Sequence, residues 1–113
     1  MERFLMLVRE DLNELKNFSH QRRLEGVHTM QKWLESLIES GNYIGGEALT
    51  PTGRYVTEDS IVSDGPFIEA KEGISGYMLF QAENIEQAAA IALTCPLVIE
   101  KKMALEVRPM LAI

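Results

Sequence analysis

The residues most able to do chemistry lie close together between positions 63 and 72. This segment reads Ser-Asp-Gly-Pro-Phe-Ile-Glu-Ala-Lys-Glu and places three carboxylates and one amine around a Gly-Pro turn. A turn between strands needs only Gly, Asn or Asp, so this density of ionisable groups is unusual. Asp64, assisted by Glu69, Lys71 or Glu72, could act as a general acid or base if burial shifts its pKa toward neutrality.

The same segment also has a structural interpretation, and the sequence leaves both open. Asp64 can cap its own turn, Gly65 allows a positive φ and Pro66 stiffens the chain. Lys71 can then pair with neighbouring carboxylates instead of contacting a ligand. The two interpretations differ in whether the carboxylates are buried.

We interpret the segment as part of a small ligand-binding site with an apolar wall. Met30 and Trp33 on a predicted helix would form that wall beside the Gly45-Gly46 pair of a predicted strand, because ligand sites combine apolar lining with few polar groups. Met and Trp on such a helix also have a plain space-filling role in a core. The complete set of predicted ligand contacts is Met30, Trp33, Gly45, Gly46, Asp64, Gly65, Pro66, Phe67, Glu69, Lys71 and Glu72.

No metal or cofactor is expected, because His, Cys, Asp and Glu show no spacing of the kind that zinc sites use. The single cysteine, Cys95, precedes Pro96 and lacks a second Cys or a nearby His. We interpret it as a buried structural thiol. His20 and His28 are interpreted as solvated surface histidines.

The composition describes one soluble domain over residues 1–113, with 46% hydrophobic and 25% charged residues. Eleven Lys and Arg against seventeen Asp and Glu give a formal net charge of -6. This charge repels phosphate backbones and acidic membranes, so direct binding to nucleic acid or membrane is not expected. The apolar run Phe4 to Val8 is too short for a signal peptide, no run could cross a membrane, and the unpaired cysteine suits a reducing compartment. These features predict a cytoplasmic protein.

The spacing of apolar residues predicts an alternation of strands and helices. The expected order is a strand over 4–8, a helix from the N-cap Ser19 to Gly41, a strand over 42–49 interrupted at Gly45-Gly46, a hairpin over 54–63, a strand over 75–82, a helix over 85–94 with Asn84 as N-cap and Pro96 as its end, and a strand over 105–110.

The long helix has one apolar stripe, which we expect to face the sheet. The opposite face carries His28 together with Lys32, Glu35 and Glu39. Trp33 falls at the edge of the stripe, whose members are Leu24, Val27, Met30, Leu34, Leu37 and Ile38.

This order predicts a ferredoxin-like α+β fold, an antiparallel sheet with two helices on one face. The chain has no further element to cover the other face of the sheet. A second copy of the protein can bury this face, so a homodimer is predicted.

A resemblance to a known family covers nearly the whole chain. Asp64-Gly65-Pro66-Phe67, followed by Glu69 and Lys71-Glu72, resembles the signature of the DGPF branch of the YCII-related family. Further matches occur in the family's order: Arg3 to Leu7, Trp33-Leu34-Glu35, Gly45-Gly46, Gly76-Tyr77, Cys95-Pro96 and Glu106-Val107-Arg108-Pro109. The resemblance implies a ferredoxin-like fold that forms dimeric α/β barrels.

The resemblance implies little about chemistry. Most members have no assigned activity, a few are lyases or dehydrochlorinases that use a His and Asp pair, and DGPF members are often linked to extracytoplasmic-function sigma factors. The family's histidine precedes the Gly that ends the first helix by a spacing that, counted back from Gly41, falls on Met30. A thioether cannot transfer protons, and His28 is about 200° away around the helix, so the pair is predicted to be absent.

We therefore expect a cytoplasmic homodimer that binds a small organic molecule near the turn at residues 64–67, with a regulatory link to sigma factors through another protein. The alternative is a metal-independent lyase or hydrolase on a small aromatic substrate, with Asp64 as acid or base. A purely structural subunit or a sigma-factor partner is the third interpretation.

Overall fold

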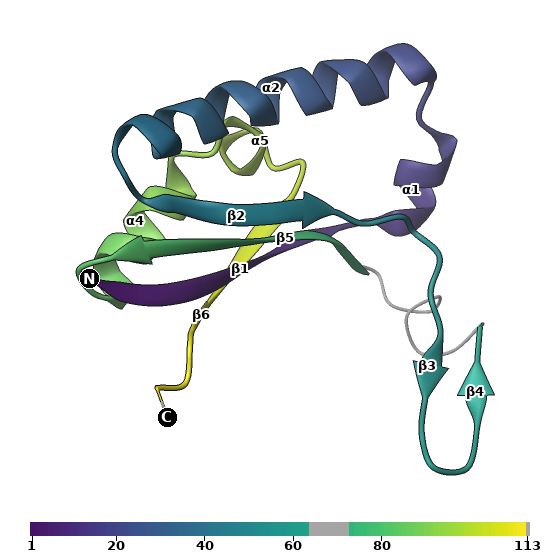
Figure 1. Ribbon diagram of the computed structural model, residues 1–113. Helices are drawn as coiled ribbons and strands as arrows, with labels where there is room; N and C mark the ends of the chain where they lie inside the picture. The colour runs from purple at the N-terminus through teal and green to yellow at the C-terminus, as the bar shows by residue number, and fades with distance from the viewer. Residues whose placement is uncertain (64–72, 113) are drawn as a thin grey trace.

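Four antiparallel strands form the main sheet of the computed structural model, which describes residues 1–63 and 73–112 (Figure 1). In sheet order they are β2 (Tyr43–Ala48), β5 (Gly73–Ala82), β1 (Glu2–Glu10) and β6 (Ala104–Pro109). Among the strands of the main sheet, β1 and β2 follow one another along the chain but are separated in the sheet by β5, and β5 and β6 are likewise separated by β1. This split βαβ arrangement is the predicted ferredoxin-like α+β fold.

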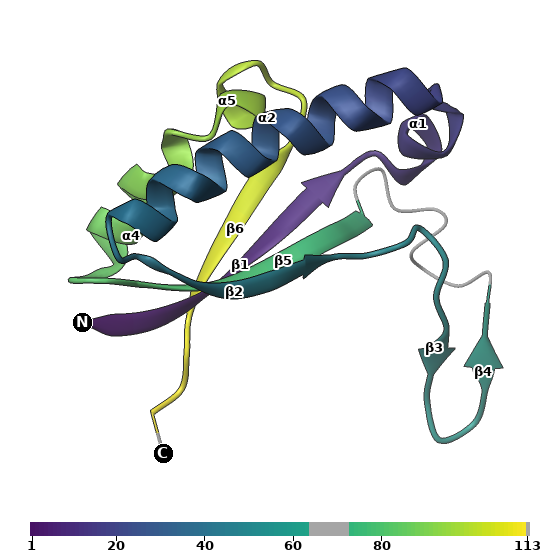
Figure 2. The same cartoon turned by 45° about the horizontal axis from the view of Figure 1, so that its top comes forward.

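The longer helices lie on one face of the sheet. Figure 2 shows α2 (His20–Glu39), α4 (Ile85–Leu93) and the short α5 (Pro96–Ile99) on the same side of the strands. Both predicted N-caps are confirmed: Ser19 Oγ accepts from the Arg22 amide at 3.1 Å, and Asn84 Oδ1 accepts from the Gln87 amide at 2.8 Å. Within the described ranges no helix combines the length and apolar character needed to cross a bilayer.

The hydrophobic core lies between this helical layer and the sheet. Alternate residues of β1 point into it, as the period of two in a strand requires, and they face alternate residues of β5 across the strand pair. The small side chains Ala88 and Ala92 let α4 approach closely. The buried apolar residues are Phe4, Met6, Val8, Trp33, Leu37, Met78, Phe80, Ala82, Ala88, Ala92 and Cys95.

The predicted apolar stripe of α2 is wrong for its first half. Trp33, predicted at the edge of the stripe, is buried with Leu37, whereas Leu24 and Val27 are 54% and 53% exposed. Ile38 is exposed as well. For Leu24 and Val27 the physical reason is length: 20 residues span about 30 Å, and only the second half of the helix rests on the core. Ile38 lies in that second half, but the face that meets the core there is the one that carries Trp33 and Leu37.

Two short helices were not predicted. The polar stretch after β1 contains α1 (Leu12–Asn17), capped by the Asp11 carboxylate, which accepts from the amides of Asn13 and Glu14. Pro96 does not end α4, which stops at Leu93, but opens α5, where a missing amide proton costs nothing.

The predicted structural role of Cys95 agrees with its position in the core. Its side chain is fully buried, and burial raises the pKa of the thiol above its usual range, partly offset by backbone hydrogen bonds from Val98 and Leu97. A buried thiol that is held protonated is a poor nucleophile.

The other face of the sheet carries half-buried and exposed apolar side chains. Leu5 lies opposite Leu79, and Leu7 lies opposite Tyr77. Among the described elements no helix covers this face (Figure 2). At its β6 side Arg9 and Arg108 both bind Glu106.

The predicted hairpin is confirmed as β3 (Tyr55–Val56) and β4 (Ile61–Val62), closed by a hydrogen bond from the Thr57 amide to the Ser60 carbonyl at 2.8 Å. It extends beyond the main sheet in both views (Figures 1 and 2). Its apolar side chains Val56 and Ile61 are largely exposed.

The ion pairs of Glu106 predict a pH dependence of stability. Arg9 Nε at 2.8 Å, more than Arg108 Nη1 at 3.1 Å, lowers the pKa of Glu106. Because the pKa is lower in the folded than in the unfolded chain, the stabilisation is complete above the unfolded value of about 4.3 and is lost as pH falls through the folded value. Urea unfolding of Glu106→Gln should therefore show a smaller loss of stability than wild type on acidification below about pH 4.5.

The matched control is Glu100→Gln, which removes an exposed carboxylate that pairs with Lys102 at 3.1 Å. An exposed pair contributes little, so this variant should keep the wild-type acid profile. Superimposable profiles for wild type and Glu106→Gln would contradict the prediction.

Candidate ligand-binding cavity

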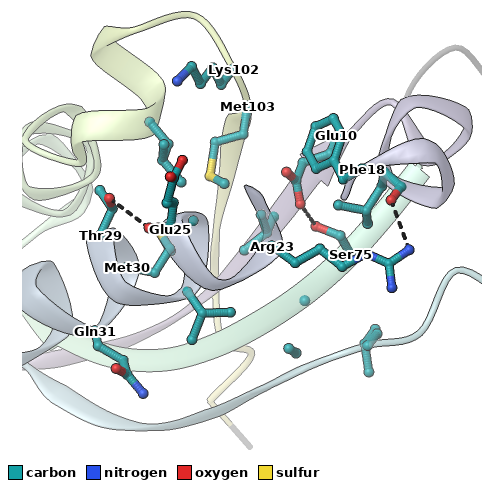
Figure 3. Close-up of a pocket in the computed structure, with 18 of the residues that line it drawn as sticks. Glu10, Phe18, Arg23, Glu25, Thr29, Met30, Gln31, Ser75, Lys102 and Met103 are labelled. Carbon is teal, nitrogen blue, oxygen red and sulfur yellow. Dashed lines mark hydrogen bonds between the residues drawn. The ribbon is translucent and has the colours of Figure 1, made fainter. Parts of the chain in front are cut away.

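A cavity of about 1190 Å³, half open to solvent, lies between the first half of α2 and the sheet. Strands β1, β2 and β5 contribute its floor, α1 lies at one end, and the chain between α5 and β6 lines the side toward the C-terminus (Figure 3). Helix α1 is held there because Leu12 contacts Gly73 so closely that a Cβ at Gly73 would collide with it. The cavity is large enough for an organic molecule of cofactor or metabolite size.

Apolar side chains make up most of the cavity wall. Methionine is prominent among them, and its flexible thioether adapts to ligands of different shape. The apolar lining includes Val8, Leu15, Phe18, Val27, Met30, Leu34, Met78, Leu97 and Met103.

Gly26 leaves space in the helical wall of the cavity. It lies within α2, where glycine destabilises a helix by roughly 0.5–1 kcal/mol relative to alanine. Gly26 lines the cavity, and a Cβ added to it would meet no atom within 4 Å. No contact inside the described protein therefore requires a glycine at this position.

A β-bulge places the main polar group of the cavity. Val8 pairs with Gly76 but Arg9 pairs with Ile74, so Ser75 is an extra residue in β5. Ser75 and Gly76 are consequently buried in succession, and Ser75 Oγ donates a short hydrogen bond to Glu10 Oε2 (Figure 3). Bulges often redirect a side chain next to a functional site.

Basic residues also line the cavity, but most are engaged with other protein groups. The Arg23 guanidinium donates to the carbonyls of Leu15 and Lys16 at 3.4 and 3.2 Å, and so caps α1. The Arg22 guanidinium lies 4.1 Å from the centre of the Phe18 ring. These contacts stabilise the N-terminal end of α2 and its connection to α1.

Only some of the ligand contacts predicted from the sequence line the cavity. Met30 and Gly46 line the cavity, whereas Gly45 does not. Trp33 has the core role instead: it is 5% exposed, and its Nε1 donates to Thr94 Oγ1 at 2.8 Å. The other predicted residues lie outside the described part of the chain: Asp64, Gly65, Pro66, Phe67, Glu69, Lys71 and Glu72.

The two glycines of the predicted strand have different roles. The strand is interrupted by a bulge at Ile44, since Tyr43 pairs with Phe80 and Gly45 with Leu79. At Gly46 the strands approach so closely that a Cβ would lie 2.5 Å from the Tyr77 carbonyl oxygen. At Gly45 a Cβ would meet nothing within 4 Å.

The described residues offer neither a metal-binding cluster nor a histidine at the cavity. Within residues 1–63 and 73–112, no three His, Cys, Asp or Glu side chains are grouped to hold a metal ion. His20 and His28 are exposed, as predicted, and neither is among the residues that line the cavity. Glu10 and Ser75 were missed by sequence reasoning because their contact depends on the bulge.

The family model of the YCII-related domain matches residues 3–111, nearly the whole chain. The chain belongs to the YCII-related family. No curated protein sequence matches it. In this YCII-related protein Met30 lines the cavity. Its Sδ accepts a hydrogen bond from Cys95 Sγ at 3.7 Å.

The glycine pair of β2 provides a test of the cavity floor. Gly46→Ala should destabilise this YCII-related protein by about 1–3 kcal/mol, because the added methyl overlaps β5 backbone. The control, Gly45→Ala, introduces the same methyl into open space and should change stability by less than about 0.5 kcal/mol. Urea unfolding measures both, and equal effects of the two substitutions would contradict the described pairing of β2 with β5.

Proposed function

We propose that this YCII-related protein is a homodimer that binds a small organic molecule in the cavity between α2 and the sheet. The observation that carries the proposal is the cavity itself, which combines a mainly apolar wall with the hydrogen-bonded pair Glu10 and Ser75. Ligand sites combine an apolar wall with polar groups that orient the bound molecule. The predicted cytoplasmic location and regulatory link belong to this proposal as expectations from the sequence.

Binding is favoured over His-Asp chemistry by the side chain at position 30. Met30 lines the cavity and has no proton to transfer, and none of the described lining residues is a histidine. The family resemblance implies a proton-transferring histidine at position 30, and Met30 can give a ligand only an apolar thioether contact.

The alternative function is a metal-independent lyase or hydrolase that uses Asp64 as acid or base. The observation in its favour is connectivity: the segment that contains Asp64 leads directly into β5, whose Ser75, Gly76 and Met78 line the cavity. Conversion of a bound molecule to product, rather than simple retention, would distinguish this alternative from the main proposal.

Gly26 allows the binding proposal to be tested by filling the cavity. Gly26→Trp places a large ring in the space and should abolish binding of compounds found in a thermal-shift screen of the wild type. Gly26→Ala should retain binding while raising the free energy of unfolding by roughly 0.5–1 kcal/mol, because alanine is the better helix former. A screen without any binder, or binders that Gly26→Trp retains, would contradict the proposal.

The dimer is supported by the apolar residues on the uncovered face of the sheet. Leu5, Leu7, Tyr77 and Leu79 lie together there, and no described helix packs on them. Burying such side chains contributes about 25 cal/mol per Å² of apolar surface. A second copy presents a matching face by two-fold symmetry.

A charge on this face should dissociate the dimer. Leu79→Glu would place a carboxylate against its symmetry-related copy, so light scattering coupled to gel filtration should detect a monomer where the wild type is a dimer. The control Leu93→Glu introduces the same charge at an exposed position of α4 and should leave the dimer intact. A monomeric wild type at micromolar concentration would contradict this part of the proposal.

A further inference from the structure

The cavity contains a carboxylate without a positively charged partner. Glu10 is half-buried at the end of β1, where its Oε2 accepts the hydroxyl of Ser75. Among the described residues no Lys, Arg or His lies within ion-pair distance of it, since the ion pairs there involve only Glu100 and Glu106. Glu10 is therefore a carboxylate of the cavity that no described side chain neutralises.

The basic residues that line the cavity do not supply this pair. Arg23 is engaged by carbonyls at the end of α1, Arg22 stacks on Phe18, and Lys102 binds Glu100 at 3.1 Å. These three side chains and Lys101, the fourth basic residue of the lining, are exposed, so their charges are largely screened by solvent. No described residue therefore supplies a positive charge to Glu10.

Ser75 holds the carboxylate in a defined orientation. The serine is only 7% exposed, and the β-bulge directs its hydroxyl toward Glu10. The hydrogen bond engages one carboxylate oxygen, Oε2. Among the described residues no donor is hydrogen-bonded to the other carboxylate oxygen, Oε1.

The surroundings of Glu10 suit the apolar body of a ligand. Figure 3 shows Glu10, Ser75 and Phe18 toward one end of the cavity and Met30 toward the other. Met103 also lines the cavity. An elongated molecule with a charged end at Glu10 would lie against these thioethers, which are polarizable and adaptable.

We propose that the cavity selects an organic cation, a protonated amine or related nitrogen group attached to an apolar or aromatic body, whose charge binds Glu10. This inference rests on the proposed function and names its ligand class. A charge-assisted hydrogen bond to a carboxylate contributes about 1.5–3 kcal/mol, which corresponds to roughly tenfold or more in affinity.

Three probes with the same aromatic body test the charge preference: phenethylamine, 2-phenylethanol and 3-phenylpropionate, titrated into the wild-type protein at neutral pH and followed by NMR. The amine should bind roughly tenfold or more tightly than the alcohol and the acid. Equal affinities, a preference for the acid through exposed Lys101, or no binding of the amine would each overturn the inference.

Two carboxylate variants assign the preference to one residue. Glu10→Gln keeps the shape and a hydrogen-bond partner for Ser75, and it should reduce the advantage of the amine over the alcohol to less than about twofold because the charge is gone. Glu58→Gln removes an exposed carboxylate of the hairpin that does not line the cavity and should preserve the advantage. An advantage retained by Glu10→Gln would overturn the inference.

The screen with Gly26→Trp distinguishes a wrong cation preference from a wrong proposed function. If neutral compounds bind the wild type and lose binding in Gly26→Trp while the amine shows no advantage, the cavity is a ligand site and only the cation preference is wrong. If neither the screen nor the probes give a binder, both proposals are wrong.

Discussion

The antiparallel pairing of β1 with β5 is the interaction on which the rest of the structure depends. The two longest strands pair from Glu2 opposite Ala82 to Glu10 opposite Gly73. Because side chains alternate along a strand, this register sends Phe4, Met6 and Val8 toward the helices and Leu5 and Leu7 to the other face. A slip of one residue would exchange the two faces of the sheet. The same register therefore determines the core, the uncovered face and the floor of the cavity.

Regular pairing builds the core, and the one irregularity in this strand pair builds the polar part of the site. Over most of its length β5 shows the alternation expected of a half-buried strand. At Ser75 the bulge places two consecutive residues on the buried side, and the serine reaches Glu10. The candidate site therefore lies where the strand pair departs from ideal geometry, beside the end of a helix that extends past the core.

Most of the fold could be predicted from the sequence because its signals are local. Apolar periodicity, Ser19, Asn84 and the hairpin turn each act within a few residues, and they predict the elements with small errors at their ends. The burial of α2 could not be predicted in the same way. The pattern favours Leu24, on the predicted stripe, over Trp33 at its edge, but the tertiary position of the helix leaves Leu24 exposed and buries Trp33.

The candidate site was predictable only in part, for a related reason. Met30 and Gly46 were found because an apolar helix face and a glycine pair are visible in the sequence, and both line the cavity. Glu10 and Ser75 are 65 residues apart and meet through a bulge, which has no sequence signature here.

The methionines that line the cavity make it sensitive to oxidation. Oxidation of Met30 or Met103 to the sulfoxide would turn an adaptable apolar wall into a polar, chiral one, so the chemistry of this cavity depends on the supply of reductant that keeps its thioethers intact.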